Sequence, residues 1–589
     1  MASRAAGSGT GRRRRGRRVG TAKLVAVAVA VSAITMITMT ASAVITKASC
    51  SDKPILVNVA VSNDIAPAIQ AVARAFNNQN LTADGRCAQV QVTEGDSAAE
   101  AGQIDGQAPQ AGLPQVQAWI PDSSLWLDIV RSYPVGAQNV QPTGQSVARS
   151  PLLMVTTAPV AAKTHLFDSQ PGWNALLPPS YGGPPASLGL AVDLPDPTDS
   201  SAGLAALVEI GRTLGTSQQA RNAFTKFAYS VQATEDFDSA SALQTFVQST
   251  RPPFDRNAVT VASEQAVLAY DLANPRAPLD ARYVTGTSRS LGTPELDYPY
   301  VLTTSSPAAL AAATEFGSYL QTKSAMAAIR YYGFRSPDGV PDAMPVAAGL
   351  TSQPLQLASA PGASEAASNL QVWQRLGLGS KDLTLIDVSP AMNQPSGNGT
   401  QSLEQELTAT AAGGLALFPD STHMGLWEIG RNSSASDPYS QLVSVGALPA
   451  DVGLLSRRVQ LQQIIQTLGT GTGNLALNKA ILDAYSAMIK TYAPNYANAV
   501  LVLTSGVDTA SGDISLHALL TRLRQLYNPA RKVEIVLIMF GHQGNFSALQ
   551  SIADATGGAA YQISDPQQVG KIFIEAIAHR ICDQGCPAP

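Results

Sequence analysis

An aspartate and a serine two positions apart could hold a metal ion at the end of a buried strand. The segment TLIDVSPAM, residues 384–392, predicts an apolar strand followed by a loop that carries Asp387 and Ser389. Carboxylate and hydroxyl oxygens are the ligands that Mg²⁺ accepts in proteins. A third oxygen would be expected at position 391, where the sequence has Ala391. We therefore expect no bound Mg²⁺ here, and no other cofactor.

Six further candidate binding residues follow strands in the first half of the chain. They are Ser62, Asn63, Ser123, Ser124, Ser200 and Ser201, each between an apolar strand and a helix. Free N–H groups and the helix dipole at such junctions favour polar ligands. The alternative at any single junction is a helix N-cap, for which serine and asparagine are preferred. Asp64, Asp122 and Asp199 occur at the same junctions and would repel an anion, so the identity of the ligand stays open.

The sequence contains no recognisable catalytic motif. It has no Gly-x-Ser-x-Gly, no His-Glu-x-x-His and no phosphate loop ending in Gly-Lys-Ser or Gly-Lys-Thr. The glycine-rich stretch 469–473 lies between two predicted helices rather than after a strand, which indicates a turn. We expect no enzyme activity, and a hydrolase acting in a cleft is the remaining enzymatic alternative.

Length and composition predict a packed, multidomain protein. The chain has 589 residues, of which 45% are hydrophobic and 14% charged, so two or three domains are expected. Residues 1–50 hold nine of the basic residues and no acid. Subtracting these nine from the net charge of −4 leaves about −13 on the rest. Nucleic acid is therefore excluded as an expected partner.

The N-terminal region predicts export. A basic segment, 1–23, precedes the uncharged residues 24–45, which are numerous enough to span a bilayer. The positive-inside rule then places the N-terminus in the cytoplasm and the body outside, as a single-pass protein of the cell membrane. A signal peptide cleaved after Ala43 is the alternative.

The four cysteines fit an oxidising compartment. Four cysteines allow three pairings. The pairing Cys50–Cys87 with Cys582–Cys586 closes two local loops, and we expect it on that ground.

Strands and helices alternate from residue 55 to the turn Gly333-Phe334-Arg335, with the strand segments ILVNVAV, VQAWI, LGLAVDL, VTVAS and LDYPYVL. In this order of elements, residues 53–340 resemble extracytoplasmic solute-binding proteins of the type that serves sulfate, molybdate and iron transporters. The resemblance implies a periplasmic-binding-protein-like domain at 51–337 with two α/β lobes and a double crossover. It also implies a cleft for a small solute, faced by the six junction residues above.

Residues 338–367 are rich in proline, alanine and serine and predict a linker. Beyond them, near-continuously apolar strands alternate with helices, which predicts a doubly wound parallel sheet of Rossmann-like type. Segments 414–421 and 424–430 are expected to be two strands of a hairpin. The Asp-x-Ser loop, VLVLTSG and ATGG make residues 380–580 similar to the von Willebrand factor A family, with a domain at 368–582.

That family places a metal-ion-dependent adhesion site at the carboxyl ends of its strands. The pattern is Asp-x-Ser-x-Ser on one loop, threonine on a second and aspartate on a third. Asp387 and Ser389 match the pattern, whereas Ala391, Leu475 and Ser505 replace the other three ligands. Thr472, Asn474 and Asp508 lie near the replaced positions. The resemblance implies a degenerate site that holds no metal.

The combined prediction is a recognition protein of the bacterial envelope. Its N-terminal helix would bind the membrane, its cleft would take a small solute, and its A domain would bind an envelope or extracellular protein. One alternative is a receptor that captures substrate for a transporter. Another is a protein-binding scaffold with an emptied or repurposed cleft.

Overall fold

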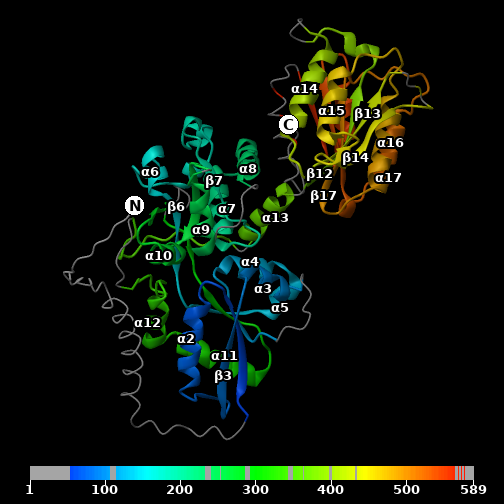
Figure 1. Cartoon of the computed structure of the whole chain (residues 1–589). Coiled ribbons are helices and arrows are strands. Elements are labelled where there is room, and N and C mark those ends of the chain that lie inside the picture. The colour runs from blue at the N-terminus through cyan, green and yellow to red at the C-terminus, as the bar shows by residue number, and fades with distance from the viewer. Residues whose placement is uncertain are drawn as a thin grey trace, which may run out of the picture.

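The computed structural model describes residues 53–106, 115–231, 240–252, 254–285, 292–342, 349–362, 364–377, 379–396, 401–431, 434 and 436–563, together with 568, 572 and 576. These residues form a first unit of two α/β lobes and a second unit around one sheet (Figure 1). The α/β class and the parallel strands expected from the sequence are thus present.

The first lobe is built on a sheet with strand order β2-β3-β1-β4-β11-β5. Its strands are β1 Ile55–Ser62, β2 Thr82–Ala83, β3 Arg86–Gly95, β4 Ala118–Ile120, β5 Gln141–Ser146 and β11 Pro299–Leu302. Its helices are α2 Ala66–Asn77, α3 Ser97–Ile104, α4 Ser124–Ser132, α5 Pro134–Asn139, α11 Pro307–Leu320 and α12 Lys323–Tyr331. Strand β1 pairs in parallel with β3 and β4, and β11 is antiparallel to β4 and β5.

The second lobe has the strand order β10-β6-β8-β7, with β9 also paired to β6. Its strands are β6 Ser150–Thr157, β7 Ala191–Asp193, β8 Ala258–Ser263, β9 Leu279–Tyr283 and β10 Glu295–Leu296. Its helices are α6 Ala158–Thr164, α7 Ser201–Leu214, α8 Gln218–Val231, α9 Ala240–Ser249 and α10 Glu264–Ala273, with short 3₁₀ turns η1 Trp173–Leu176, η2 Pro179–Tyr181 and η3 Ala186–Leu188.

The chain passes from the first lobe to the second after β5, at residues 147–149, and returns after β10, at residues 297–298. The two passages lie side by side, because the backbone N–H of Val147 donates to the carbonyl oxygen of Tyr298 at 3.0 Å. The double crossover implied by the resemblance is therefore present. It brings residues about 150 positions apart in the sequence to the boundary between the lobes.

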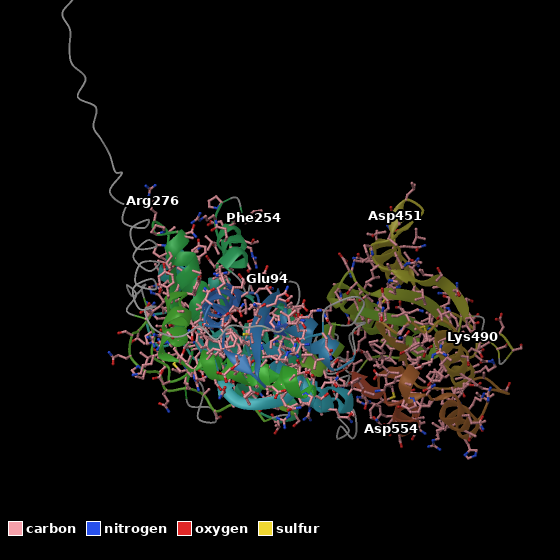
Figure 2. All side chains as sticks on the ribbon, turned by 90° about the horizontal axis from the view of Figure 1, so that it is seen from below. Glu94, Phe254, Arg276, Asp451, Lys490 and Asp554 are labelled. Carbon is pink, nitrogen blue, oxygen red and sulfur yellow. The ribbon has the colours of Figure 1, made fainter. Side chains whose placement is uncertain are left out.

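The second unit has one sheet of order β14-β13-β12-β17-β18-β19, parallel except for the edge strand β14. Its strands are β12 Gly379–Asp387, β13 His423–Ile429, β14 Ser440–Ala447, β17 Tyr496–Thr504, β18 Val533–Phe540 and β19 Ala559–Ile563, with a separate hairpin of β15 Asp451–Val452 and β16 Leu455–Ser456. Its helices are α14 Leu403–Leu417, α15 Arg457–Thr467, α16 Leu477–Lys490, α17 Leu516–Leu526 and α18 Phe546–Asp554, with η4 Pro390–Asn393 and η5 Pro529–Arg531. Asp451, in the hairpin, lies at a protruding edge of this unit (Figure 2). Apolar cores lie on both faces of the sheet.

The strand predicted at 414–421 is wrong. Residues up to Leu417 continue helix α14, which begins with a capping box between Ser402 and Gln405. Leu403, Leu407 and Leu415 are buried on one side of this helix, at helical spacing. The antiparallel partner of β13 is instead β14, which comes later in the chain.

Helix α13 (Glu365–Gly377) follows the proline-rich segment and packs against α4, α7 and α8 of the first unit. Leu370, Trp373 and Leu376 are buried in the apolar core of that unit. The Trp373 indole N–H donates to Asp196 Oδ1 at 3.1 Å. Since α4 belongs to one lobe and α7 and α8 to the other, α13 contacts both lobes. The domain limits at 338–367 and 368–582 remain predictions.

The predicted location in the cell membrane is corrected by the structure. Among the residues that it describes, no helix is long and apolar enough to cross a membrane. Segments 1–23 and 24–45, on which the prediction depended, lie outside the described residues.

The described part of the chain contains no free cysteine, and Cys87 is disulfide-bonded. Cys50, Cys582 and Cys586 lie outside that part, so the expected pairs remain predictions.

Candidate functional site

The two lobes meet through direct hydrogen bonds at the predicted cleft. The hydroxyl of Ser201, at the start of α7, donates to Asp122 Oδ1 at 2.6 Å. The indole N–H of Trp126, in α4, donates to the same hydroxyl at 2.6 Å. Asp122 follows β4 in the first lobe and Ser201 belongs to the second lobe. A fully buried serine therefore joins the lobes.

A second carboxylate, Asp64, lies close to Asp122 after strand β1. Asp64 accepts hydrogen bonds from the hydroxyls of Tyr298 and Ser62, the latter at 2.7 Å. Burial raises the pKa of Asp64 despite these hydrogen bonds. Burial, reinforced by the charge of Asp64, raises the pKa of Asp122 to about 7. The two carboxyls thus share a boundary at which one of them is easily protonated.

A cavity of about 90 Å³ lies beside these contacts and between the lobes. Its polar lining includes Ser123 and Ser124 of the first lobe and Glu209, Glu295 and Asp297. Asp297 accepts a hydrogen bond from the backbone N–H of Ser124 at 2.7 Å, yet burial raises its pKa. Burial also raises the pKa of Glu295 to about 7, against the opposing effect of Arg149. The cavity is rich in carboxyl and hydroxyl oxygens.

The proline-rich segment covers this cavity. Residues 358–361 form part of its lining. Thr293 pairs with the segment as a short bridge, accepting from Ala358 N–H and donating to the Gln356 carbonyl oxygen, both at 2.9 Å. Arg212 donates to the Ser359 carbonyl oxygen at 3.0 Å and ion-pairs with Glu365 at 2.8 Å. A segment read from the sequence as a linker is thus held against the cleft.

The structure brings most of the six predicted binding residues to this boundary, but several already have partners. Ser123 and Ser200 cap α4 and α7 by accepting from the N–H groups of Leu125 and Gly203. Asn63 is exposed. The N-cap alternative therefore describes Ser123 and Ser200, while Ser201 bonds to the first lobe and Ser124 lines the cavity.

Four residues of the site were missed by the sequence analysis, namely Glu209, Glu295, Asp297 and Tyr298. Their position at the boundary depends on how the chain crosses between the lobes, and no local sequence pattern indicates such a crossing. Tyr298 has the left-handed φ of 43°, an uncommon backbone state for a bulky residue, and this too is invisible in sequence. The one available signal is the acidic, aromatic run ELDYPY, residues 295–300, which extends from β10 into β11, the last strand of the first lobe.

In the second unit, Asp387 is buried and fully engaged with the chain itself. Its Oδ1 accepts from the Ser389 N–H at 2.8 Å. Its Oδ2 accepts from the hydroxyls of Thr504 and Ser505, each at 2.9 Å, and from the Ser505 N–H at 3.0 Å. Ser505, the residue found in place of the expected aspartate, thus donates to the carboxylate that would otherwise bind a cation.

Two residues of the neighbouring loops, Leu475 and Asp508, have partners of their own. The Leu475 N–H donates to the Thr509 hydroxyl at 2.8 Å. Burial, then the charge of Asp513, raises the pKa of Asp508 to about 6. Among the described residues, no group of three or more histidine, cysteine or acidic side chains is placed to hold a metal ion.

No curated protein sequence matches this chain. Similar solved structures include the sulfate-binding protein SubI from Mycobacterium tuberculosis H37Rv (18% identity, TM-score 0.34, covering 48% of this chain and 87% of that one). Iron-bound HitA from Pseudomonas aeruginosa is 14% identical, with a TM-score of 0.39, and covers 55% of this chain and 100% of its own. A von Willebrand factor type A protein from Catenulispora acidiphila is 16% identical, with a TM-score of 0.26, and covers 34% of this chain and 43% of its own.

The TM-scores all lie below 0.5, so the fold described above rests on the chain's own strand order. A sequence match adds to it. Residues 57–335, a little under half of the chain, match the family model of bacterial extracellular solute-binding proteins, and this match supports solute capture outside the cytoplasm.

Proposed function

We propose that this protein works in recognition outside the cytoplasm, capturing a small solute in its first unit and binding a protein partner with its second. The observation that carries the first part is the interlobe cavity, which is lined by Ser124, Glu209, Glu295 and Asp297. Pockets with a few converging polar groups between two lobes are the usual place for small ligands. The family match over residues 57–335 supports the same function.

The chemistry of the lining favours a cationic or hydroxyl-bearing solute. The carboxyl groups would repel an anion, whereas they accept hydrogen bonds from ammonium or hydroxyl groups. Arg149 and Arg212 are the nearby cations, and both are already paired, with Glu295 and with Glu209 and Glu365. Amines, amino acids with basic side chains and sugars are therefore the expected ligand classes.

The second part of the proposal concerns the A-type domain. We propose that the second unit, built on the sheet from β12 to β19, is a von Willebrand factor A domain that recognises a protein without a shared metal ion. Support comes from the doubly wound sheet and from Asp387, whose oxygens accept four hydrogen bonds from the chain.

A protein-binding scaffold without a solute is the second candidate function. Two observations favour it: the direct bond between Asp122 and Ser201, and residues 358–361 lying over the cavity. In that case the chain's own segments fill the place of the ligand.

A thermal-shift screen of the full chain separates the two functions. The compounds are amines, basic amino acids, sugars, and the anions sulfate and molybdate. Solute capture predicts a dose-dependent rise in melting temperature with a cationic or hydroxylated compound, lost in Glu295→Gln and kept in Glu94→Gln, an exposed control. The absence of any shift across all classes contradicts solute capture and leaves the scaffold.

A further inference from the structure

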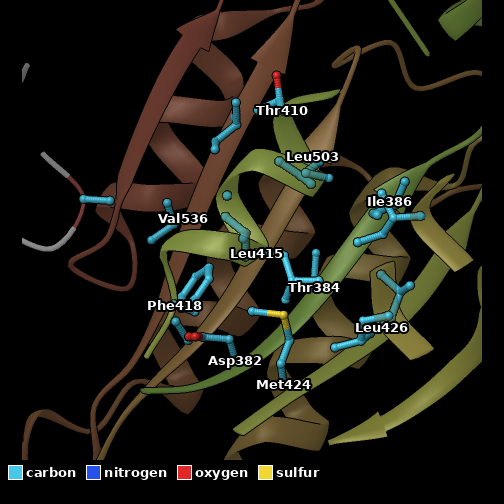
Figure 3. A pocket seen from close by; sticks show the side chains of 18 of the residues that line it. Asp382, Thr384, Ile386, Thr410, Leu415, Phe418, Met424, Leu426, Leu503 and Val536 are labelled. Atoms are coloured by element: carbon cyan, nitrogen blue, oxygen red, sulfur yellow. The ribbon is translucent and has the colours of Figure 1, made fainter. Parts of the chain in front are cut away.

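A second cavity lies in the second unit, far in sequence from the interlobe site. Its volume is about 100 Å³. It lies between one face of the sheet, formed by β12, β13, β17 and β18, and the helices α14 and α15, and Ile572 and Ala576 also line it (Figure 3). Close-packed interiors have few voids larger than a water molecule, so a space of this size is unusual.

Most of the described lining is apolar. The sheet contributes Ile386, Leu426 and Leu503, and α14 and the residues after it contribute Leu415 and Phe418. Figure 3 shows these side chains around the space, with the strands on one side and the helix on the other. Apolar cavities of about this size stay dry and bind small molecules such as benzene.

Two threonine hydroxyls belong to this lining. Thr384 on β12 and Thr410 on α14 both line the cavity and are buried. The Oγ1 of each has no hydrogen-bond partner within the part of the chain that the structure describes. Buried hydroxyls are normally paired, because an unpaired one loses its hydrogen bonds to water. Both hydroxyls are thus available to a molecule inside the cavity.

Acidic groups in the lining limit the charge of that molecule. Asp382 and Glu534 line the cavity. Asp382 accepts from the Ser380 hydroxyl, and Glu534 pairs with Lys532 at 2.7 Å. An anionic head group, such as the carboxylate of a fatty acid, would be repelled by them.

We propose that this cavity binds a small neutral molecule with an apolar body and a single hydroxyl group. The apolar body fills the space between the sheet and α14. The hydroxyl pairs with Thr384 or Thr410, which each offer one donor and two acceptor positions.

The test uses the full chain and two probes of equal shape, phenol and toluene, in a calorimetric titration. Both should bind saturably at one site, with phenol tighter by about tenfold, the equivalent of one hydrogen bond. Ala411→Leu, which adds bulk to the cavity wall, should abolish binding of both. Ala416→Leu, the same change at an exposed position of α14, should leave both unchanged.

Threonine variants test the hydroxyl contact. One of the two variants, Thr384→Val or Thr410→Val, should weaken the binding of phenol about tenfold, to the affinity of toluene. The affinity for toluene itself should stay the same. Thr260→Val is the control, since Thr260 is also buried, with a hydroxyl that has no partner among the described residues, but lies in the first unit. No saturable binding, or binding unaffected by Ala411→Leu, overturns the proposal. Equal affinity of phenol and toluene also overturns it, and the valine variants decide the matter if Ala411→Leu fails to fold.

Discussion

Replacing Asp122 by asparagine should remove a pH-dependent loss of stability from the first unit. The pKa of Asp122 rises from 3.8 to about 7, first through burial and then through the charge of Asp64. The folded protein therefore binds a proton that the unfolded chain has released. Stability from this group is complete below pH 3.8, falls as the pH rises from about 4 to 7, and is lost above 7.

The magnitude follows from the size of the shift. Each pKa unit corresponds to about 1.4 kcal/mol, so a rise of about three units amounts to roughly 4 kcal/mol over the whole range. Between pH 5 and pH 8 only about two of these units remain, or roughly 3 kcal/mol. Asparagine resembles the protonated form and keeps an oxygen that accepts from the Ser201 hydroxyl. The free energy of unfolding of the variant, minus that of the natural protein, should therefore be about 3 kcal/mol larger at pH 8 than at pH 5.

Urea unfolding followed by tryptophan fluorescence at pH 5, 6, 7 and 8 measures this difference. Four of the five tryptophans, at 119, 126, 173 and 373, are packed into the first unit, so its transition dominates the signal. Asp84→Asn, at an exposed position, is the control. Parallel pH profiles for Asp122→Asn and the natural protein would show that Asp122 is ionised when folded, and the account of the interlobe boundary would be refuted.

Three other outcomes are expected. Arg335→Met leaves Glu264 buried without its 3.0 Å ion pair and should lower the free energy of unfolding of the first unit by about 3–5 kcal/mol in urea; a loss below about 1 kcal/mol would contradict this. Millimolar Mg²⁺ should leave the melting temperature of the full chain unchanged, whereas Asp387→Ala, which removes an acceptor of four hydrogen bonds, should lower the free energy of unfolding by about 3 kcal/mol. A rise in melting temperature with Mg²⁺ that is lost in the variant would show a working metal site. Arg212→Ala frees the segment that it holds through backbone carbonyls and Glu365, so limited proteolysis should cut at 349–362 several-fold faster, and an unchanged rate would mean that these contacts do not hold the segment.

Local patterns in the sequence predict much of the fold. Apolar strands followed by serine caps, as at Ser123 and Ser200, mark where helices begin, because cap chemistry acts within a few residues. Short apolar runs are ambiguous, and the stretch ending at Leu417 reads equally well as strand or helix. The edge strand β14 was missed because most of its residues are exposed or only partly buried, so its apolar pattern is weak.

The site could be predicted only in part. Its serines lie next to strands, which is a local feature. The pairing of Asp122 with Ser201 and of Asp64 with Tyr298 depends on how two lobes close and on where the chain crosses between them. No short stretch of sequence encodes the closure of the lobes or the position of the crossover. The replacement of metal ligands at Ser505 could be read from the sequence, but not that its hydroxyl would turn to Asp387.

Helix α13 contacts both lobes of the first unit, and only residue 378 separates it from β12, a central strand in the sheet of the second unit. A helix followed this closely by a strand leaves little slack in the chain. Mechanical tension applied through the second unit would therefore reach α13 before any other part of the first unit. Pulling α13 away would expose Trp373 and remove the packing contacts that this helix makes with both lobes. We therefore expect a pulling force on the second unit to loosen the contact between the two lobes through this helix.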